Sequence, residues 1–152
     1  MKIGCLGAAR ITPNAIVQPA TELDMVTLQA VASSDVRRAQ NYAEKYKFVE
    51  VLASYQEVIS ADNIDIVYNA LPNHLHAKWT IRALESGKHV ICEKPMAMNM
   101  AEASAVIAAA RSSGRRVIEA FHCRYHPAYE QMLLWLSSGK IGNVKDIRAH
   151  FT

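Results

Sequence analysis

Two short polar segments of the sequence carry the residue types best suited to chemistry. Residues 69–76 read Asn-Ala-Leu-Pro-Asn-His-Leu-His, and residues 93–95 read Glu-Lys-Pro. Each directly follows a short apolar run, which predicts that each lies at the carboxyl end of a strand, the edge at which parallel sheets bind ligands. A lysine at such an edge can move a proton or polarise a carbonyl group. A lone lysine is more often a solvated surface charge, so the role of Lys94 depends on its surroundings.

A third segment, residues 7–11, could bind phosphate. It lies between a predicted strand and a predicted helix, where free backbone N–H groups and the helix dipole favour a pyrophosphate. The candidates for binding a cofactor here are Gly7, Ala8, Ala9, Arg10 and Ile11. In the register of the dinucleotide fingerprint, only the first of three glycine positions holds glycine, because Ala9 and Thr12 occupy the others. Alanine permits close approach if its φ stays negative, and the turn by itself fits an ordinary strand-to-helix loop equally well.

The end of the second predicted strand indicates which dinucleotide would bind. An acidic residue is expected there when a ribose diol is bound, but the sequence has Ser33 and Ser34, with Arg38 close behind. Two hydroxyls and a guanidinium suit a 2′-phosphate, so these residues favour NADP, while NAD remains possible because a serine pair tolerates either form. Asp35 is more simply a helix cap, and Arg38 could also belong to a solvated helix face.

The elements needed to position these segments follow from the hydrophobic pattern. Short β-rich runs alternate with amphipathic stretches, as a parallel sheet with crossover helices requires. We expect an α/β fold of the doubly wound, parallel-sheet Rossmann type. The predicted strands are 3–6, 27–32, 49–52, 64–70, 89–92 and 116–120, and the predicted helices are one capped by Asp35, then 55–60, 74–85 and 100–113, the last capped by Asn99 and closed by Gly114.

The alternation stops after Phe121, which divides the chain into a dinucleotide-binding domain, residues 1–121, and a second segment, residues 122–152. A helix over 127–136 and an apolar-alternating strand containing Ile147, Ala149 and Phe151 are predicted there. That strand has no later partner in the sequence. We therefore expect only the start of a truncated C-terminal α+β domain, with an uncovered strand edge that promotes self-association.

Composition excludes several classes of protein. The formal net charge of +3 arises from 17 basic and 14 acidic residues without a basic run, so nucleic acid is not an expected partner. No leader or apolar span long enough for a membrane is visible, and Cys5, Cys92 and Cys123 read as reduced, buried thiols, so a cytoplasmic protein is predicted. The histidine pairs at 74 and 76 and at 122 and 126 lack a third ligand at a suitable spacing, so no metal site is expected.

Together, the two polar segments resemble the signature motifs of the glucose-fructose oxidoreductase/inositol dehydrogenase family. The likeness extends to the Gly-Ala-Ala turn, to Gly-Lys-His-Val at 87–90 and to residues 119–127, and it looks nearest to the branch with glucose-fructose oxidoreductases and dihydrodiol dehydrogenases. This resemblance implies that Lys94 is the catalytic residue beside the nicotinamide and the reacting hydroxyl. It implies that Glu93 contacts the nicotinamide end and that Arg124 lies near the cofactor. It also implies a wall along the cofactor riboses formed by Ala70, Leu71, Pro72, Asn73 and His76, although Asn73 could instead cap the following helix.

The resemblance also implies the reaction, which is hydride transfer between a nicotinamide cofactor and a hydroxyl of a sugar, polyol or diol. In that family a second domain supplies the acid/base partner of the lysine, so this chain alone is expected to be inactive. The alternative is a non-catalytic dinucleotide-binding or cofactor-sensing module. Additional coding sequence with an acid/base motif would favour the enzyme.

Overall fold

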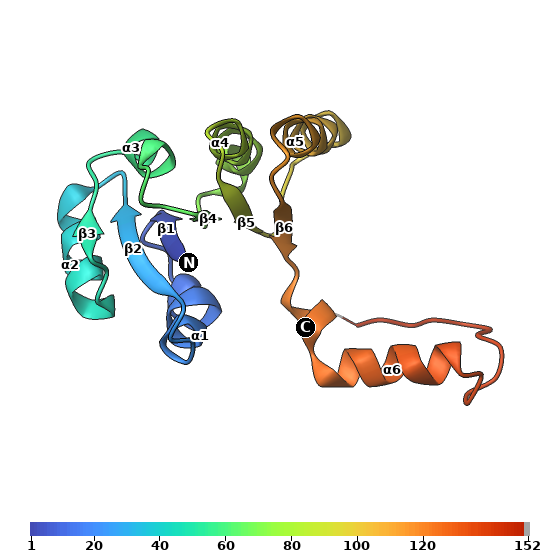
Figure 1. Cartoon of the computed structure of the whole chain (residues 1–152). Coiled ribbons are helices and arrows are strands. Elements are labelled where there is room, and N and C mark those ends of the chain that lie inside the picture. Colours follow the sequence, from blue (N-terminus) through green and yellow to red (C-terminus); the bar gives the residue numbers. More distant parts are fainter. Residues whose placement is uncertain (151–152) are drawn as a thin grey trace. The chain divides into compact units, whose positions relative to one another are not determined.

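Alternating short strands and helices build a parallel sheet in the first part of the chain. The computed structural model describes residues 1–150, which divide into two units, Met1–Ala120 and a second unit that begins at Phe121. In the first unit six parallel strands are ordered β3-β2-β1-β4-β5-β6 (Figure 1). The strands are β1 (Lys2–Leu6), β2 (Thr27–Ala32), β3 (Glu50–Val51), β4 (Ile66–Asn69), β5 (His89–Glu93) and β6 (Val117–Ala120). This order is that of the dinucleotide-binding Rossmann fold, so the predicted fold class is confirmed.

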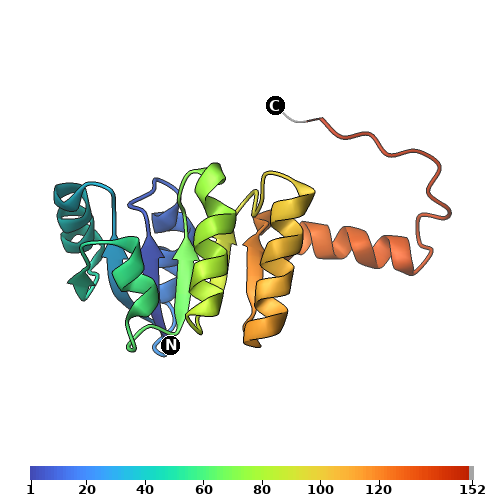
Figure 2. The same ribbon diagram turned by 90° about the horizontal axis from the view of Figure 1, so that it is seen from above.

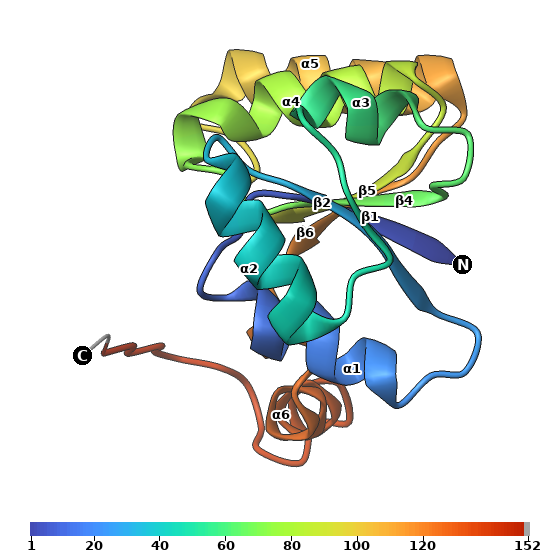
Figure 3. The same ribbon diagram turned by 90° about the vertical axis from the view of Figure 1, so that its left-hand side faces the viewer.

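Helices cover both faces of this sheet (Figure 3). One face carries α3 (Tyr55–Ser60), α4 (Asn73–Glu85) and α5 (Met100–Ser113), which lie side by side (Figure 2). The other face carries α2 (Val36–Tyr46) and a π-helical turn, η1 (Pro13–Val17), that runs into α1 (Gln18–Thr21). Each face has its own apolar core, one including Val58, Ile64 and Leu84 and the other including Ile3, Val31 and Phe48.

Side-chain caps begin α2 and α5 where the sequence predicts them. The Oδ1 atom of Asp35 accepts from the backbone N of Arg38 at 3.2 Å, and that of Asn99 accepts from Glu102 N at 3.0 Å. Helix α5 ends at Gly114, whose φ is 66°. The capping alternative for Asn73 is wrong, because α4 begins one residue earlier than predicted and Pro72 is its N-cap, without a side-chain hydrogen bond. The chain direction is set there by the proline, which leaves Asn73 inside the first turn.

The second unit contains a short 3-10 helix, η2 (His122–Tyr125), and α6 (Pro127–Ser137). The strand predicted around Ile147 and Ala149 is wrong for the described part of the chain, because residues 143–150 form no strand, and Phe151 lies outside the described residues. An alternating apolar pattern becomes a strand only when another backbone pairs with it. No helix within residues 1–150 is both long and apolar enough to cross a membrane.

Strand β1 passes so close to the α3 side of the sheet that it requires a glycine. A Cβ atom added to Gly4 would lie 2.6 Å from Val58 Cγ1 and 2.7 Å from Ile64 Cδ1. At these distances the side chains of Val58 and Ile64 would have to move. The close approach allows the central strand to pack beneath α3.

We expect Gly4→Ala to lower the free energy of unfolding by about 1–3 kcal/mol, because the added methyl group overpacks the core. Chemical denaturation of the two proteins measures this difference. In the double variant Gly4→Ala/Val58→Ala, removal of the nearest methyl groups should make the loss smaller than the sum of the two single losses. Strict additivity would show that the contact with Val58 is not the cause.

Candidate functional site

The site is built where the strand order reverses, between β1 and β4. These neighbouring strands pair in parallel with Leu6 opposite Asn69, so the turns that follow them meet at the carboxyl edge of the sheet. A hollow of about 480 Å³ lies at this edge. It is lined by Gly7, Ala8, Ala9, Ser34, Arg38, Tyr55, Ala70, Leu71, Pro72 and Leu75. Three segments that the sequence singled out separately, at 7–11, 33–38 and 69–76, are therefore brought together.

The turn after β1 requires glycine at its first position. Gly7 has a φ of 95°, and its backbone N donates to Ala32 O at 2.8 Å. A Cβ atom there would lie 3.2 Å from the carbonyl oxygen of Ala70, so the turn and the end of β4 are in close contact. Ala9 is not among the residues with positive φ, which meets the condition under which alanine still permits close approach of a phosphate.

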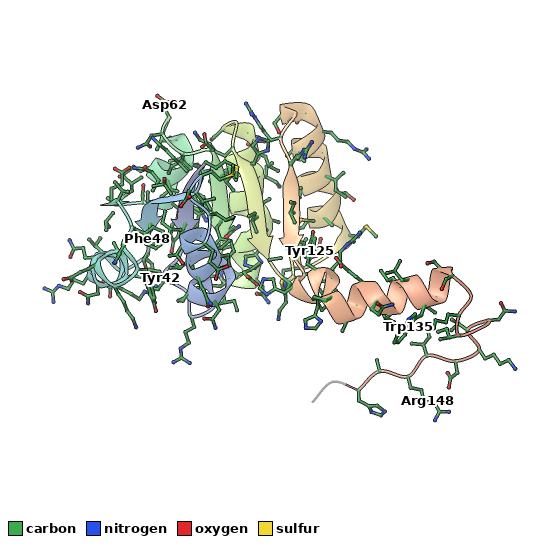
Figure 4. The ribbon with its side chains drawn as sticks, turned by 60° about the horizontal axis from the view of Figure 1, so that its bottom comes forward. Tyr42, Phe48, Asp62, Tyr125, Trp135 and Arg148 are labelled. Atoms are coloured by element: carbon green, nitrogen blue, oxygen red, sulfur yellow. The ribbon has the colours of Figure 1, made fainter. Side chains whose placement is uncertain are left out.

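A tyrosine on α2 holds this turn from the other side. The hydroxyl of Tyr42 donates to the backbone carbonyl of Ala9 at 2.8 Å, and burial raises the pKa of Tyr42 to about 12, so the phenol stays a donor at neutral pH. Tyr42 packs against Phe48, with ring centroids 6.1 Å apart (Figure 4). Arg10 and Ile11, the other candidates in this segment, are exposed after the turn.

The serine pair after β2 holds a guanidinium at the hollow. Arg38 donates to Ser33 Oγ from Nε at 3.0 Å and from Nη2 at 2.8 Å, and Nη2 is also 3.3 Å from Ser34 Oγ. Ser33 is 5% exposed, whereas Ser34 and Arg38 line the hollow. The arginine is thus fixed by its neighbours with its charge at the site, a fork suited to a phosphate.

The segment after β4 is held by a buried amide. Asn69 is 0% exposed; its Nδ2 donates to His76 O and to Thr80 Oγ1, both at 3.1 Å, and its Oδ1 accepts from Leu71 N at 3.3 Å. Every polar atom of this side chain is therefore used inside the protein. The result is a fixed Ala70-Leu71-Pro72 wall along the hollow, with Asn73 exposed at its end.

His76 occupies a different place from the one expected. The family resemblance implied that it forms part of the wall along the cofactor riboses, but its side chain is 1% exposed and is not part of the lining of the hollow. Its ring nitrogens lie 2.6 Å from Leu71 O and 2.7 Å from Pro95 O. His76 is buried because it lies on the inner face of α4, and the helical periodicity determines which residues lie on that face.

The Glu-Lys-Pro segment follows β5 at the same edge. Glu93 is 8% exposed, and its Oε1 accepts a hydrogen bond of 2.7 Å from the hydroxyl of Tyr68 on β4. Burial, and then this bond to a carboxylate, raise the pKa of Tyr68 well above its usual range. Lys94 is exposed and precedes a cis peptide bond to Pro95. The backbone N of Met96 donates to Glu119 Oε1 at 2.9 Å, so β6 also holds this turn.

Several residues that shape the site were not identified from the sequence. Three of them lie in stretches read only as helix or strand, namely Tyr42, Tyr55 and Tyr68. Glu119 begins the family-like segment 119–127, but no role was assigned to it. The tyrosine in β4 is a signal that could have drawn attention, because a buried hydroxyl needs a partner. Arg124 is exposed in the second unit.

Residues 1–150 hold no group of three or more His, Cys, Asp or Glu side chains that could bind a metal. The thiols differ from expectation in one case. Cys5 and Cys92 are free and buried, and burial raises the pKa of Cys92 to about 11, which disfavours a nucleophilic thiolate. Cys123 was predicted to be buried and is exposed, because the segment around it forms η2 rather than part of an apolar layer.

Known proteins are similar to this chain in sequence. Residues 1–121 match the family described as "Oxidoreductase family, NAD-binding Rossmann fold". The chain is 36% identical, over 99% of its length, to trans-1,2-dihydrobenzene-1,2-diol dehydrogenase of Xenopus laevis and 34% identical, over 100%, to D-xylose 1-dehydrogenase (NADP(+)) 2 of Haloferax volcanii. It spans 46% of the length of each of these curated relatives.

Solved structures agree with the sequence comparisons. A 3-ketoreductase from Actinomadura kijaniata, solved in complex with NADP and TDP-benzene, superposes with a TM-score of 0.84 at 32% identity, covering 91% of this chain and 42% of the reductase. An apo scyllo-inositol dehydrogenase from Lactobacillus casei, at 24% identity and a TM-score of 0.86, supports the fold alone. Both support the fold described above.

Proposed function

The chain belongs to the glucose-fructose oxidoreductase/inositol dehydrogenase family, and from this we propose that it binds NADP(H) for an enzyme that oxidises or reduces a sugar, polyol or diol. The nucleotide-binding domain would comprise residues 1–121. The observation that carries the proposal is the convergence of the Gly7 turn, the Ser34 and Arg38 side chains and the Leu71 wall on one hollow. The proposed NAD(P)-binding role of the hollow rests on the family, and the proposed substrate class rests on the names of the relatives.

The residues present fit such a cofactor from its adenosine end to its pyrophosphate. The guanidinium of Arg38, held by Ser33 and Ser34, would pair with a 2′-phosphate through charge-assisted hydrogen bonds. Glycine at position 7 allows the positive φ of the turn whose backbone would meet the pyrophosphate. No acidic side chain among the residues that line the hollow opposes the 2′-phosphate.

Lys94 is the proposed catalytic residue. It lies at the carboxyl end of β5, one strand away from the hollow, in a turn that Glu93 and Pro95 help to hold. The cofactor supplies the hydride chemistry when it is bound. The ammonium group of Lys94 would hydrogen-bond the oxygen on the reacting carbon, stabilising the charge that develops there and moving its proton.

We also propose a cytoplasmic location and self-association. Cys5 and Cys92 are free thiols, as in proteins of a reducing compartment. The second unit exposes apolar side chains on α6 and beyond it, including Trp135 (Figure 4), Leu134 at 59% and Ile147 at 82%. Such surfaces bind other apolar surfaces in water.

We expect NADPH to raise the melting temperature of the chain more than NADH, because only NADPH offers a phosphate to Arg38. Arg38→Ala should remove the difference. Arg37→Ala, which deletes the neighbouring exposed arginine, is the matched control and should retain it. Ser34→Asp should reverse the preference, since a carboxylate repels the phosphate and accepts from a diol. Equal shifts with both cofactors in the unaltered chain would contradict the assignment.

Lys94→Ala, assayed in the whole protein with sugar and diol substrates, is expected to lower kcat by ~10²–10⁴-fold, the usual cost of removing a general acid/base. Fluorescence titration with NADPH shows in parallel whether the cofactor site survives. Near-normal turnover in this variant would refute the role of Lys94.

The chain should elute as an oligomer, because the exposed apolar residues of the second unit are covered when copies associate. Light scattering coupled to size exclusion measures its mass. Leu134→Glu, which charges the surface of α6, should shift the population toward the monomer. A monomer at all concentrations would count against self-association.

A further inference from the structure

One buried histidine connects the two turns that form the site. The imidazole of His76 lies 2.6 Å, through Nε2, from the carbonyl oxygen of Leu71 in the turn after β4. Through Nδ1 it lies 2.7 Å from the carbonyl oxygen of Pro95 in the turn after β5. These two turns are more than twenty residues apart in sequence. The turn after β4 borders the hollow, and the turn after β5 carries Lys94.

We propose that His76 is a positioning residue, which sets the distance between the wall of the cofactor hollow and the turn that carries Lys94. This inference rests on the function proposed above for those two turns. His76 does not touch the cofactor in this proposal; it acts through the backbone of Leu71 and of Pro95.

Burial makes the bridge effective. Both partners are carbonyl oxygens, which accept, so the imidazole donates to both when each ring nitrogen carries a proton. At 1% exposure, water cannot replace either contact, so a turn that moved away would leave a buried polar group without a partner. The backbone of His76 is fixed as well, because its carbonyl oxygen accepts from Asn69 Nδ2 at 3.1 Å and Asn69 Oδ1 accepts from Leu71 N. The bridge therefore has a rigid end at β4 and α4, from which it holds the Pro95 turn.

Two further hydrogen bonds hold the Lys94 turn from neighbouring strands. Tyr68 on β4 donates to Glu93 Oε1 at 2.7 Å, and Glu119 on β6 accepts from Met96 N at 2.9 Å. With His76 acting from α4, the residues on both sides of Lys94 are fixed from three elements. The side chain of Lys94 itself remains exposed, as a residue that meets a ligand must be.

A purely structural role would predict something different. If His76 only filled the core, its substitution would lower stability and weaken all ligands alike. A positioning role predicts that the two hydrogen bonds have separable effects on the two ends of the cofactor. Each of the two contacts can be removed separately by substitution. An asparagine amide nitrogen takes the place of Nδ1, and a glutamine amide nitrogen takes the place of Nε2.

The test compares binding of NADPH with binding of 2′-phospho-ADP-ribose, which lacks the nicotinamide ring, by calorimetry on the whole 152-residue chain. His76→Gln keeps the donor toward Leu71 and loses the one toward Pro95. We expect it to weaken NADPH by roughly three- to tenfold, the worth of one hydrogen bond, and to leave 2′-phospho-ADP-ribose unchanged. His76→Asn keeps the donor toward Pro95 and should weaken both ligands by similar factors, because both need the Leu71 wall.

A second pair of variants covers the case in which changes at buried His76 prevent folding. Glu119 is exposed, and Glu119→Ala removes the acceptor for Met96 N whereas Glu119→Gln retains an oxygen there. The alanine variant should lower the affinity for NADPH only, and the glutamine variant should restore it. An unchanged ratio of the two affinities in every folded variant would overturn the positioning role. Failure of the unaltered chain to bind either ligand would instead overturn the proposed function on which it rests.

Discussion

The parallel pairing of β1 with β4 is the constraint on which the site depends. It places the turn after β1 directly against the end of β4, at a distance that leaves little room for a Cβ atom on Gly7, whose positive φ also favours glycine. Strand β2 on the other side of β1 then delivers Ser33 and Ser34 to the same edge. Because all strands run in one direction, every turn at their carboxyl ends points toward the same space. The hollow is a consequence of this register rather than of any single motif.

A layer of buried polar side chains converts that register into a rigid site. Asn69, Tyr68, Glu93 and His76 are each buried, and each would destabilise the fold if it had no partner. Their hydrogen bonds join β4 to β5 and to α4, and join α4 to the turns after β4 and β5. The same hydrogen bonds that satisfy these buried groups therefore also fix the backbone near Lys94. Buried polar groups with complete hydrogen bonds specify one arrangement, since any displacement leaves one of them unsatisfied.

Local signals accounted for most element boundaries. Strand β2 and helices α3 and α5 have the predicted bounds, and Asp35, Asn99 and Gly114 act as predicted, because caps and periodicity operate within a few residues. The errors have non-local causes. Residues 143–150 alternate like a strand but pair with no other segment of residues 1–150. Cys123 lies in an apolar-looking stretch that forms an exposed 3-10 helix.

The sequence by itself determined the βα alternation, the phosphate-turn candidates, the Ser33, Ser34 and Arg38 group and the two polar segments at strand ends, since each is encoded by neighbouring residues. Only the tertiary structure decided how those segments are coupled. That Tyr68 meets Glu93, that Tyr42 holds Ala9 and that His76 faces the protein interior follow from which strands pair and which face of α4 packs inward. Such contacts join residues far apart in the chain, and their energies depend on burial, which no local pattern contains.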